Sequence, residues 1–469
     1  MQQFRPTKNL SHSASREGNN KGSLTARELA FIGIGGIIGA GYFLGVGLPI
    51  RTAGPAVLLS FVLGAFVTSQ VVGSLASMAV NEPVEGSFKV YADEYMGSFS
   101  GYLQGWIYYV SSVLTISSEA VASAIFTKMW LPHLPLWMMS GAYALLVFLV
   151  NAFGIKNFGR VESVMSAVKM AALLGFIIYA ALVLFGGGFS PAAGGAGQSP
   201  GIEQFVKQPF FPHGFSGFMQ SMLIVIFAYA GIGVFGTATG EARDGKTIDK
   251  GALWTVASLL FLYLASVFLV LSIEPWSNMN TSASPFVVAL QRSGIPVIAT
   301  VFNAVILIAS FSVMAGSVFS ANQILASLGT EREAPGVTTE RGRNGTGYGA
   351  LWITAGATAV SLLVSNVLPS NVYNFLISAS SFFTFLNWFL ILWTFLRWRK
   401  SQSAKSFMSL LSFGKPFTTY LTMLLIVVLA GYALVEPDQR LGFYGFLIVL
   451  AGLAGSFLFV RKRIVTKPH

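Results

Sequence analysis

Long apolar stretches follow one another along almost the whole chain, separated by short polar connections. Twelve of them hold about twenty mostly apolar residues each, which is the length that an α-helix needs to cross the hydrocarbon core of a bilayer. Backbone groups in lipid must be hydrogen-bonded within the segment, so we expect helices rather than strands. The predicted spans are 28–48, 55–79, 101–127, 134–153, 161–185, 216–238, 251–273, 295–327, 348–367, 371–396, 417–435 and 441–461.

The composition agrees with a protein embedded in a membrane. Hydrophobic residues make up 54% of the 469 residues and charged residues only 10%, whereas soluble domains carry about 25% charged residues. There is no cysteine, which excludes disulfides and cysteine metal sites. Residues 1–26 are polar and basic and have neither a short apolar core nor a cleavage site. We therefore predict a cytoplasmic N-terminal tail rather than a signal peptide.

The net charge of +11 follows the predicted topology and does not indicate a nucleic-acid partner. If the chain begins in the cytoplasm, 23 of its 29 lysines and arginines fall in cytoplasmic segments, and Lys169 lies within a span. The remaining five, on the opposite side, are Arg51, Lys128, Lys207, Arg292 and Arg440. This asymmetry is the positive-inside rule and predicts that both termini are cytoplasmic.

Glycines interrupt two of the predicted spans. The stretch GIGGIIGAGYFLG at 33–45 places six glycines in the first span, and FAYAGIGVFGTATGE at 227–241 interrupts the sixth. Glycine costs about 1 kcal/mol in a helix interior, so such a cluster requires a reason. Interrupted helices at matching positions of two halves indicate a transporter of inverted repeats that binds its substrate at the breaks. Spans one to five and six to ten would be the repeats.

Two interpretations of these glycines are open. In the first, the helices unwind, and glycine permits unusual backbone angles and a close approach of a ligand. The N-terminus of a half-helix then favours a carboxylate and freed carbonyls favour a cation, which together suit an α-amino acid. In the second, the glycines form small packing faces between spanning helices. The matched pair of glycine-rich stretches favours a binding site.

The chain resembles bacterial amino acid permeases of the amino acid–polyamine–organocation (APC) superfamily. The resemblance covers 25–400 and rests on both glycine-rich stretches and on PVEGSFKVYADEYMG (83–97), GYLQGWIYY (101–109) and SEAVASAIFTKMWLP (118–132). It implies an all-α membrane protein with the LeuT-type fold, twelve transmembrane helices, and a 5+5 inverted repeat with interrupted helices 1 and 6. The transport core would occupy 27–400, and 401–469 would hold helices 11–12 and a cytoplasmic C-terminal tail.

The resemblance also implies a substrate site built from backbone groups of the two breaks. Backbone N–H groups of Gly39, Ala40 and Gly41 would bind the substrate carboxylate. Tyr229 would lie against the pocket, and Gly231 aligns with a glycine of the second break. The carbonyls expected to hold the substrate ammonium are those of Ile37, Ile38, Phe227, Ala228 and Tyr229.

Two ionisable residues, Glu119 and Lys169, lie deep within predicted spans, where a charge is costly. A lysine removed from water can release its proton near neutral pH. Similar proton-coupled permeases have a lysine at the place of Lys169, which implies contacts with carbonyls of the first span and with Ser312. The alternative is a lysine whose ammonium extends to the membrane interface. Glu119 matches a family glutamate and is either part of proton coupling or a structural carboxylate.

Several residues depart from the family pattern. Gly233 stands where the family commonly has a glutamate, Ala315 replaces an asparagine and Gln323 an arginine, and no proline follows Gly240-Glu241. Glu241 itself is expected to brace the inner end of the sixth span. With little acid left near the site, a neutral substrate is favoured over a cationic one.

We therefore predict a secondary active transporter of a bacterial plasma membrane that imports a neutral amino acid by proton symport with alternating access. Its partners would be the amino acid, protons and the bilayer, with no nucleic acid and no cofactor. No Walker A, HExxH or nucleophile-elbow sequence supports ATP-driven transport or an enzyme. The alternatives are an amino acid exchanger of the same fold, in which Lys169 is a fixed structural cation, and a channel or non-transporting sensor.

Overall fold

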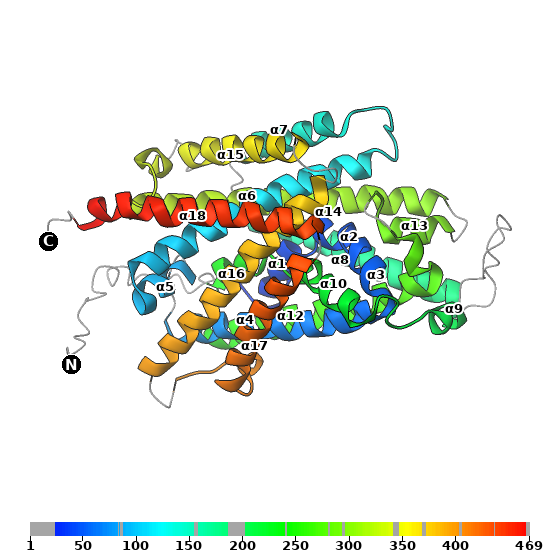
Figure 1. The fold of residues 1–469 in the computed structure, drawn as a ribbon, viewed down its shortest axis with the longest axis horizontal. Helices are drawn as coiled ribbons and strands as arrows, with labels where there is room; N and C mark the ends of the chain where they lie inside the picture. The colour runs from blue at the N-terminus through cyan, green and yellow to red at the C-terminus, as the bar shows by residue number, and fades with distance from the viewer. Residues whose placement is uncertain are drawn as a thin grey trace.

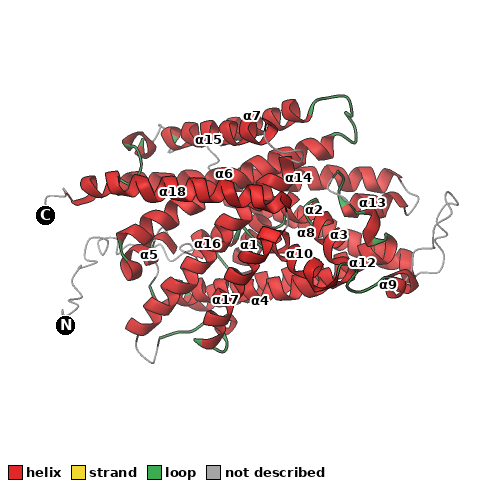
Figure 2. Ribbon diagram, in the orientation of Figure 1, coloured by secondary structure: helices red, strands yellow, loops and turns green. Residues whose placement is uncertain are grey.

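Helices make up nearly all of the described chain, and no strand occurs in it (Figure 2). The computed structural model describes residues 24–82, 84, 88–153, 158–185, 202–239, 242–279, 282–292, 296–340, 347–367, 372–402, 406–435 and 437–465. Residues 1–23 of the predicted N-terminal tail, much of the connection 186–215, and Gly240 and Glu241 lie outside the described residues.

The helices follow the predicted spans closely. Ten helical segments of the described chain are long and apolar enough to cross a membrane, and Leu136–Ala152 is a shorter apolar helix. The exact count of twelve spans therefore stays a prediction. The α-helices are α1 (Ala26–Ile37), α2 (Ala40–Phe43), α3 (Gly47–Ala53), α4 (Val57–Asn81), α5 (Phe88–Met96), α6 (Ser98–Thr127), α7 (Leu136–Ala152), α8 (Phe158–Phe185), α9 (Ile202–Lys207), α10 (Gly214–Ala228), α11 (Ile232–Ala238), α12 (Gly245–Ile273), α13 (Pro285–Arg292), α14 (Pro296–Thr330), α15 (Tyr348–Val367), α16 (Val372–Ser401), α17 (Phe417–Tyr432) and α18 (Pro437–Val465).

The first and sixth predicted spans are both interrupted. The first is divided into α1, α2 and α3, and the sixth into α10 and α11. A capping box fixes the start of α1, because the Thr25 hydroxyl accepts from the Glu28 N–H while the Glu28 carboxylate accepts from the Thr25 N–H.

The interrupted helices lie in the interior, among long continuous helices (Figure 1). The first span packs against α12, α8 and α11, and α6 packs against α14 and α16. At one edge of the molecule α7 and α15 lie side by side. This arrangement surrounds both breaks with the side chains of α6, α8, α12, α14 and α16.

Candidate functional site

The first break separates α1 from α2. The last hydrogen bond of α1 runs from the Ile38 N–H to the Ile34 carbonyl, and the next turn begins where Tyr42 and Phe43 donate to the Gly39 carbonyl. Gly39 has φ −142° and ψ −156°, an extended conformation that other residues also adopt. The unusual angles expected of glycine are therefore not found here. A Cβ on Gly39 would instead lie 2.6 Å from Glu119 Oε1, so close packing requires the glycine.

A carboxylate of the protein binds the N-terminus of α2. The Ala40 N–H lies 3.1 Å from Oε1 and 3.0 Å from Oε2 of Glu119. The hydroxyl of Ser310, on α14, donates to Oε2 at 2.6 Å. The Glu119 side chain is fully enclosed, and residue 119 is only 2% exposed. A carboxylate thus occupies the position that sequence analysis predicted for the carboxylate of the substrate.

The second break differs in its backbone conformation. Gly231 precedes α11 with φ +99°, a left-handed angle that side-chain-bearing residues rarely adopt. A Cβ at this position would lie 2.4 Å from the carbonyl oxygen of Gly36. The two breaks therefore contact each other through backbone. At the end of α10, the Tyr263 hydroxyl donates to the Ala228 carbonyl at 2.8 Å.

Lys169 on α8 reaches the first span one turn before its break. Its Nζ lies 2.6 Å from the Gly35 carbonyl oxygen and 3.5 Å from Oε1 of Glu162. Ser312 was expected to contact the ammonium, but its hydroxyl donates to Glu162 Oε2 at 2.8 Å. Glu162 accounts for this correction, since its carboxylate lies between the lysine and the α14 hydroxyl.

Sequence reasoning missed Glu162 because it stands at the start of its predicted span, where a charge is unremarkable. A usable signal was its spacing: Glu162 precedes Lys169 by seven residues, which is two turns on the same helix face. Both side chains are almost completely buried. The ammonium therefore does not extend to the membrane interface.

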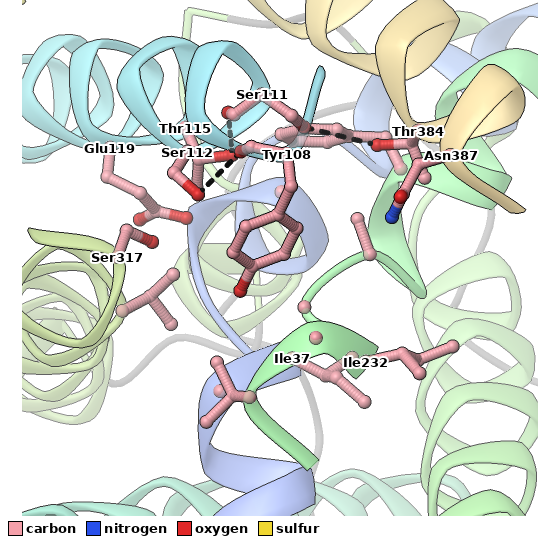
Figure 3. Close-up of a pocket in the computed structure, with 18 of the residues that line it drawn as sticks. Ile37, Tyr108, Ser111, Ser112, Thr115, Glu119, Ile232, Ser317, Thr384 and Asn387 are labelled. Carbon is pink, nitrogen blue, oxygen red and sulfur yellow. Dashed lines mark hydrogen bonds between the residues drawn. The ribbon is translucent and has the colours of Figure 1, made fainter. Parts of the chain in front are cut away.

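A small cavity of about 60 Å³ borders the two breaks. Five predicted residues line it, namely Ile37, Gly41, Glu119, Phe227 and Gly231. The rest of its wall comes mainly from α6, α11 and α16, with Val313 and Ser317 from α14 (Figure 3).

Tyr229 does not line this cavity, contrary to the expectation. Its hydroxyl donates to the Phe61 carbonyl at 3.0 Å, and its ring packs against those of Phe61 and Tyr263. Phe227, two residues earlier, is the aromatic residue of α10 that faces the cavity. The helix ends between these two residues, which turns their side chains in different directions.

A cluster of aromatic rings packs around the breaks, and none of its residues lines the cavity. The rings of Tyr42 and Tyr263 are stacked with their centroids 3.9 Å apart. Edge contacts extend this cluster from α2 to α4, α8, α13 and α14. All its members are buried: Tyr42, Phe43, Phe61, Phe176, Tyr229, Tyr263, Phe286 and Phe302. We call these eight residues the aromatic cluster.

The three residues that depart from the family pattern, Gly233, Ala315 and Gln323, lie in different environments. A Cβ on Gly233 would lie 2.2 Å from the ring of Tyr108, so that ring fills the space a larger side chain would need. Ala315 is buried, whereas Gln323 is exposed. The absence of a glutamate at Gly233 is thus compensated by an aromatic side chain from α6.

Polar residues of α6 and α16 in the cavity wall were not predicted. Tyr108, Ser111, Ser112 and Thr115 follow one another on the face of α6 that ends in Glu119. Thr384 and Asn387 lie one turn apart on α16. Polar residues at spacings of three and four within otherwise apolar spans were the available signal.

Comparisons with known proteins agree with this geometry. Residues 28–465 match the sequence model of the amino acid permease family. The uncharacterized amino acid permease YtnA of Bacillus subtilis is 32% identical over 92% of this chain and 94% of its own. The amino-acid permease RocC of the same organism is 32% identical (94% and 95% covered). The aromatic amino acid transport protein AroP of Escherichia coli K12 is 27% identical (94% and 96% covered).

Among solved structures, a manganese transporter of Eremococcus coleocola aligns with a TM-score of 0.58. It covers 94% of both chains at 13% sequence identity, which establishes similarity of fold alone. The predicted fold class, an all-α membrane protein of the LeuT type, is confirmed.

Proposed function

The chain belongs to the amino acid permease family, and from this membership and the geometry of its breaks we propose that it imports a neutral amino acid by proton symport. As a family member it is a multi-pass membrane protein that transports amino acids and is not an enzyme. We also propose that the protein lies in a bacterial plasma membrane with both termini in the cytoplasm. One observation carries it: ionisable side chains bind the backbone of the first break.

The position of Glu119 links substrate binding to protonation. A substrate carboxylate that binds the Ala40 N–H must displace the carboxylate of Glu119 from it. A buried charge without its hydrogen-bond partners is costly. The displaced carboxylate would therefore take up a proton, and substrate and proton would enter the site together.

Lys169 provides a second point of coupling. Its ammonium joins α8 to the Gly35 carbonyl and, through Glu162, to Ser312 on α14. Protonation of Lys169 holds these three elements together and favours the outward-open state. Release of its proton to the cytoplasm weakens the ion pair and lets the first span move away from α8 and α14.

The distribution of packed and open space supports alternating access. With both termini in the cytoplasm, the aromatic cluster lies on the outer side of the breaks. The cavity then lies on the cytoplasmic side, since it is lined by Gly36 and Ile37 before the first break and by Ile232 to Val234 after the second. This arrangement corresponds to a state that is closed to the outside while the Lys169 contacts are still formed, before the lysine releases its proton.

Uptake into proteoliposomes tests the proposal. Labelled amino acids are offered with and without an inward pH gradient to the full chain and to Lys169→Ala, Glu119→Gln and Lys207→Ala. We expect a neutral amino acid to accumulate only with the gradient and Lys169→Ala to lose this accumulation. Glu119→Gln should transport with little pH dependence. Lys207, exposed and paired with Glu203 by helix spacing, serves as the control. Gradient-driven accumulation by Lys169→Ala would contradict the proposal.

The ion pair of Lys169 with Glu162 favours one alternative, an amino acid exchanger in which the lysine is a fixed structural cation. An exchanger would take up label only when an amino acid is preloaded inside, with or without a pH gradient. The same proteoliposomes distinguish the two functions, because a symporter needs no internal amino acid.

A further inference from the structure

The part of the cavity wall that α16 contributes contains an amide with a fixed orientation. Gln104 Nε2 donates to the backbone oxygen of Asn387 at 3.3 Å and to its Oδ1 at 2.6 Å. A backbone carbonyl can only accept, so the nitrogen of Gln104 is fixed at this position. Oδ1 of Asn387 is consequently the bonded end of its amide.

The other end of this amide is available to a ligand. Nδ2 of Asn387 points toward the cavity (Figure 3), and within the described chain it donates to no protein group. The residue is only 7% exposed, so its N–H groups have little access to bulk water. A donor that faces a cavity without a protein partner can form a hydrogen bond with a ligand there. The cavity therefore presents a directed hydrogen-bond donor.

Three hydroxyls of the cavity wall offer hydrogen-bond acceptors, whereas Asn387 offers a donor. Ser112, Thr115 and Thr384 each donate to the carbonyl four residues earlier, at 2.9, 2.9 and 3.0 Å. A hydroxyl has a single hydrogen, so these three oxygens can only accept further bonds. They lie on α6 and α16, the helices that also position Gln104 and Asn387.

The wall of the cavity offers no free charged group to a substrate side chain. Glu119 is the single charged residue among the described residues that line the cavity, and both its oxygens accept hydrogen bonds. A cationic side chain of a substrate finds no free carboxylate here, and an anionic one finds no cation. An aliphatic or aromatic side chain would leave Nδ2 of Asn387 without a partner.

We propose that this wall selects an amino acid with a carboxamide side chain, glutamine or asparagine, by pairing its amide with Asn387 and with these hydroxyls. The carbonyl oxygen of the substrate amide accepts from Nδ2 of Asn387, and its two N–H groups donate to two of the three hydroxyl oxygens. A serine or threonine side chain carries one hydrogen and satisfies fewer of these groups. This inference rests on the proposed function for its transport readout.

Binding to the purified full chain, measured by titration calorimetry, tests the inference without requiring transport. Glutamine and asparagine are compared with leucine, phenylalanine, serine, lysine and glutamate. The key variant is Asn387→Asp, which keeps an acceptor for Gln104 and replaces the cavity-facing donor by an acceptor. We expect carboxamide affinity to fall at least tenfold, which corresponds to about 1.4 kcal/mol. Asn322→Asp, at a partly buried acceptor of Thr354 outside the cavity, is the matched control.

A second variant keeps the inference testable if Asn387→Asp does not fold. Thr115→Val has the shape of threonine without its acceptor and should weaken glutamine and asparagine binding several-fold. Thr330→Val removes the same type of hydroxyl from an exposed position and should change nothing. Tighter binding of phenylalanine or leucine than of both carboxamides would overturn the inference, as would unchanged carboxamide affinity in a folded Asn387→Asp.

Proteoliposome uptake separates this inference from the proposed function. Gradient-driven accumulation of leucine, with no competition by glutamine or asparagine, would keep the symporter and overturn the carboxamide site. Tight carboxamide binding that Asn387→Asp weakens, together with uptake independent of the gradient, would keep the site and overturn proton symport.

Discussion

The two breaks touch each other, but chemically different groups bind their backbones. In the first, the Ala40 N–H binds the carboxylate of Glu119, and the nearby Gly35 carbonyl binds the ammonium of Lys169. In the second, the Ala228 carbonyl binds the phenol of Tyr263, and Gly231 makes the turn through its own left-handed conformation. Ionisable side chains therefore stabilise one break, and neutral groups with backbone geometry stabilise the other.

This difference assigns the two breaks different parts in a transport cycle. Hydrogen bonds to a carboxylate or an ammonium change when either group gains or loses a proton. A left-handed glycine and a phenol do not respond to protons in this way. We therefore expect the first break to respond to the proton gradient and the second to remain fixed beside it.

The largest effect on uptake and folding should come from Gly231→Ala, which disturbs the backbone conformation of the second break. A left-handed conformation costs a non-glycine residue about 1–2 kcal/mol, and the added Cβ would lie 2.4 Å from the Gly36 oxygen, so the first span must also move. We expect almost complete loss of uptake and a large loss of monodisperse protein in size-exclusion chromatography. Gly356→Ala on α15, with open space around the new Cβ, should behave as the wild type. Normal uptake by Gly231→Ala would show that the second break is not fixed by its glycine.

The next effect concerns the ionisable break and its buried ion pair. Lys169→Met leaves Glu162 buried without its cation, and removing one partner of such a pair costs about 3–5 kcal/mol. The double variant Lys169→Met with Glu162→Gln leaves no buried charge and should recover much of this loss. Thermal unfolding of the purified proteins, followed by fluorescence, measures the difference. Equal stability of the single and double variants would mean that the two side chains do not depend on each other.

Sequence alone predicted the helices and the breaks well, because both follow from local patterns. Apolar length located the spans, and glycine density located 33–45 and 227–241. The contacts at the breaks are a different matter. That Glu119 bonds Ala40, 79 residues away, depends on how α6 packs against the first span. Local patterns could not predict that Phe227 rather than Tyr229 faces the cavity. The direction of each side chain depends on the residue at which α10 ends, which is Ala228.

The smallest effects should come from the phenols, which offer one matched pair across the two breaks. Tyr263 donates to the Ala228 carbonyl and Tyr373 to the Ala40 carbonyl, both at 2.8 Å and both buried. Substitution of either by phenylalanine removes one neutral hydrogen bond and should lower stability by about 1 kcal/mol. The two variants should differ in transport, since Ala40 also carries the Glu119 carboxylate. We expect the pH dependence of uptake to change in Tyr373→Phe and to stay that of the wild type in Tyr263→Phe. An equal change in both would mean that the second break also responds to protons, and the distinction between the breaks would be lost.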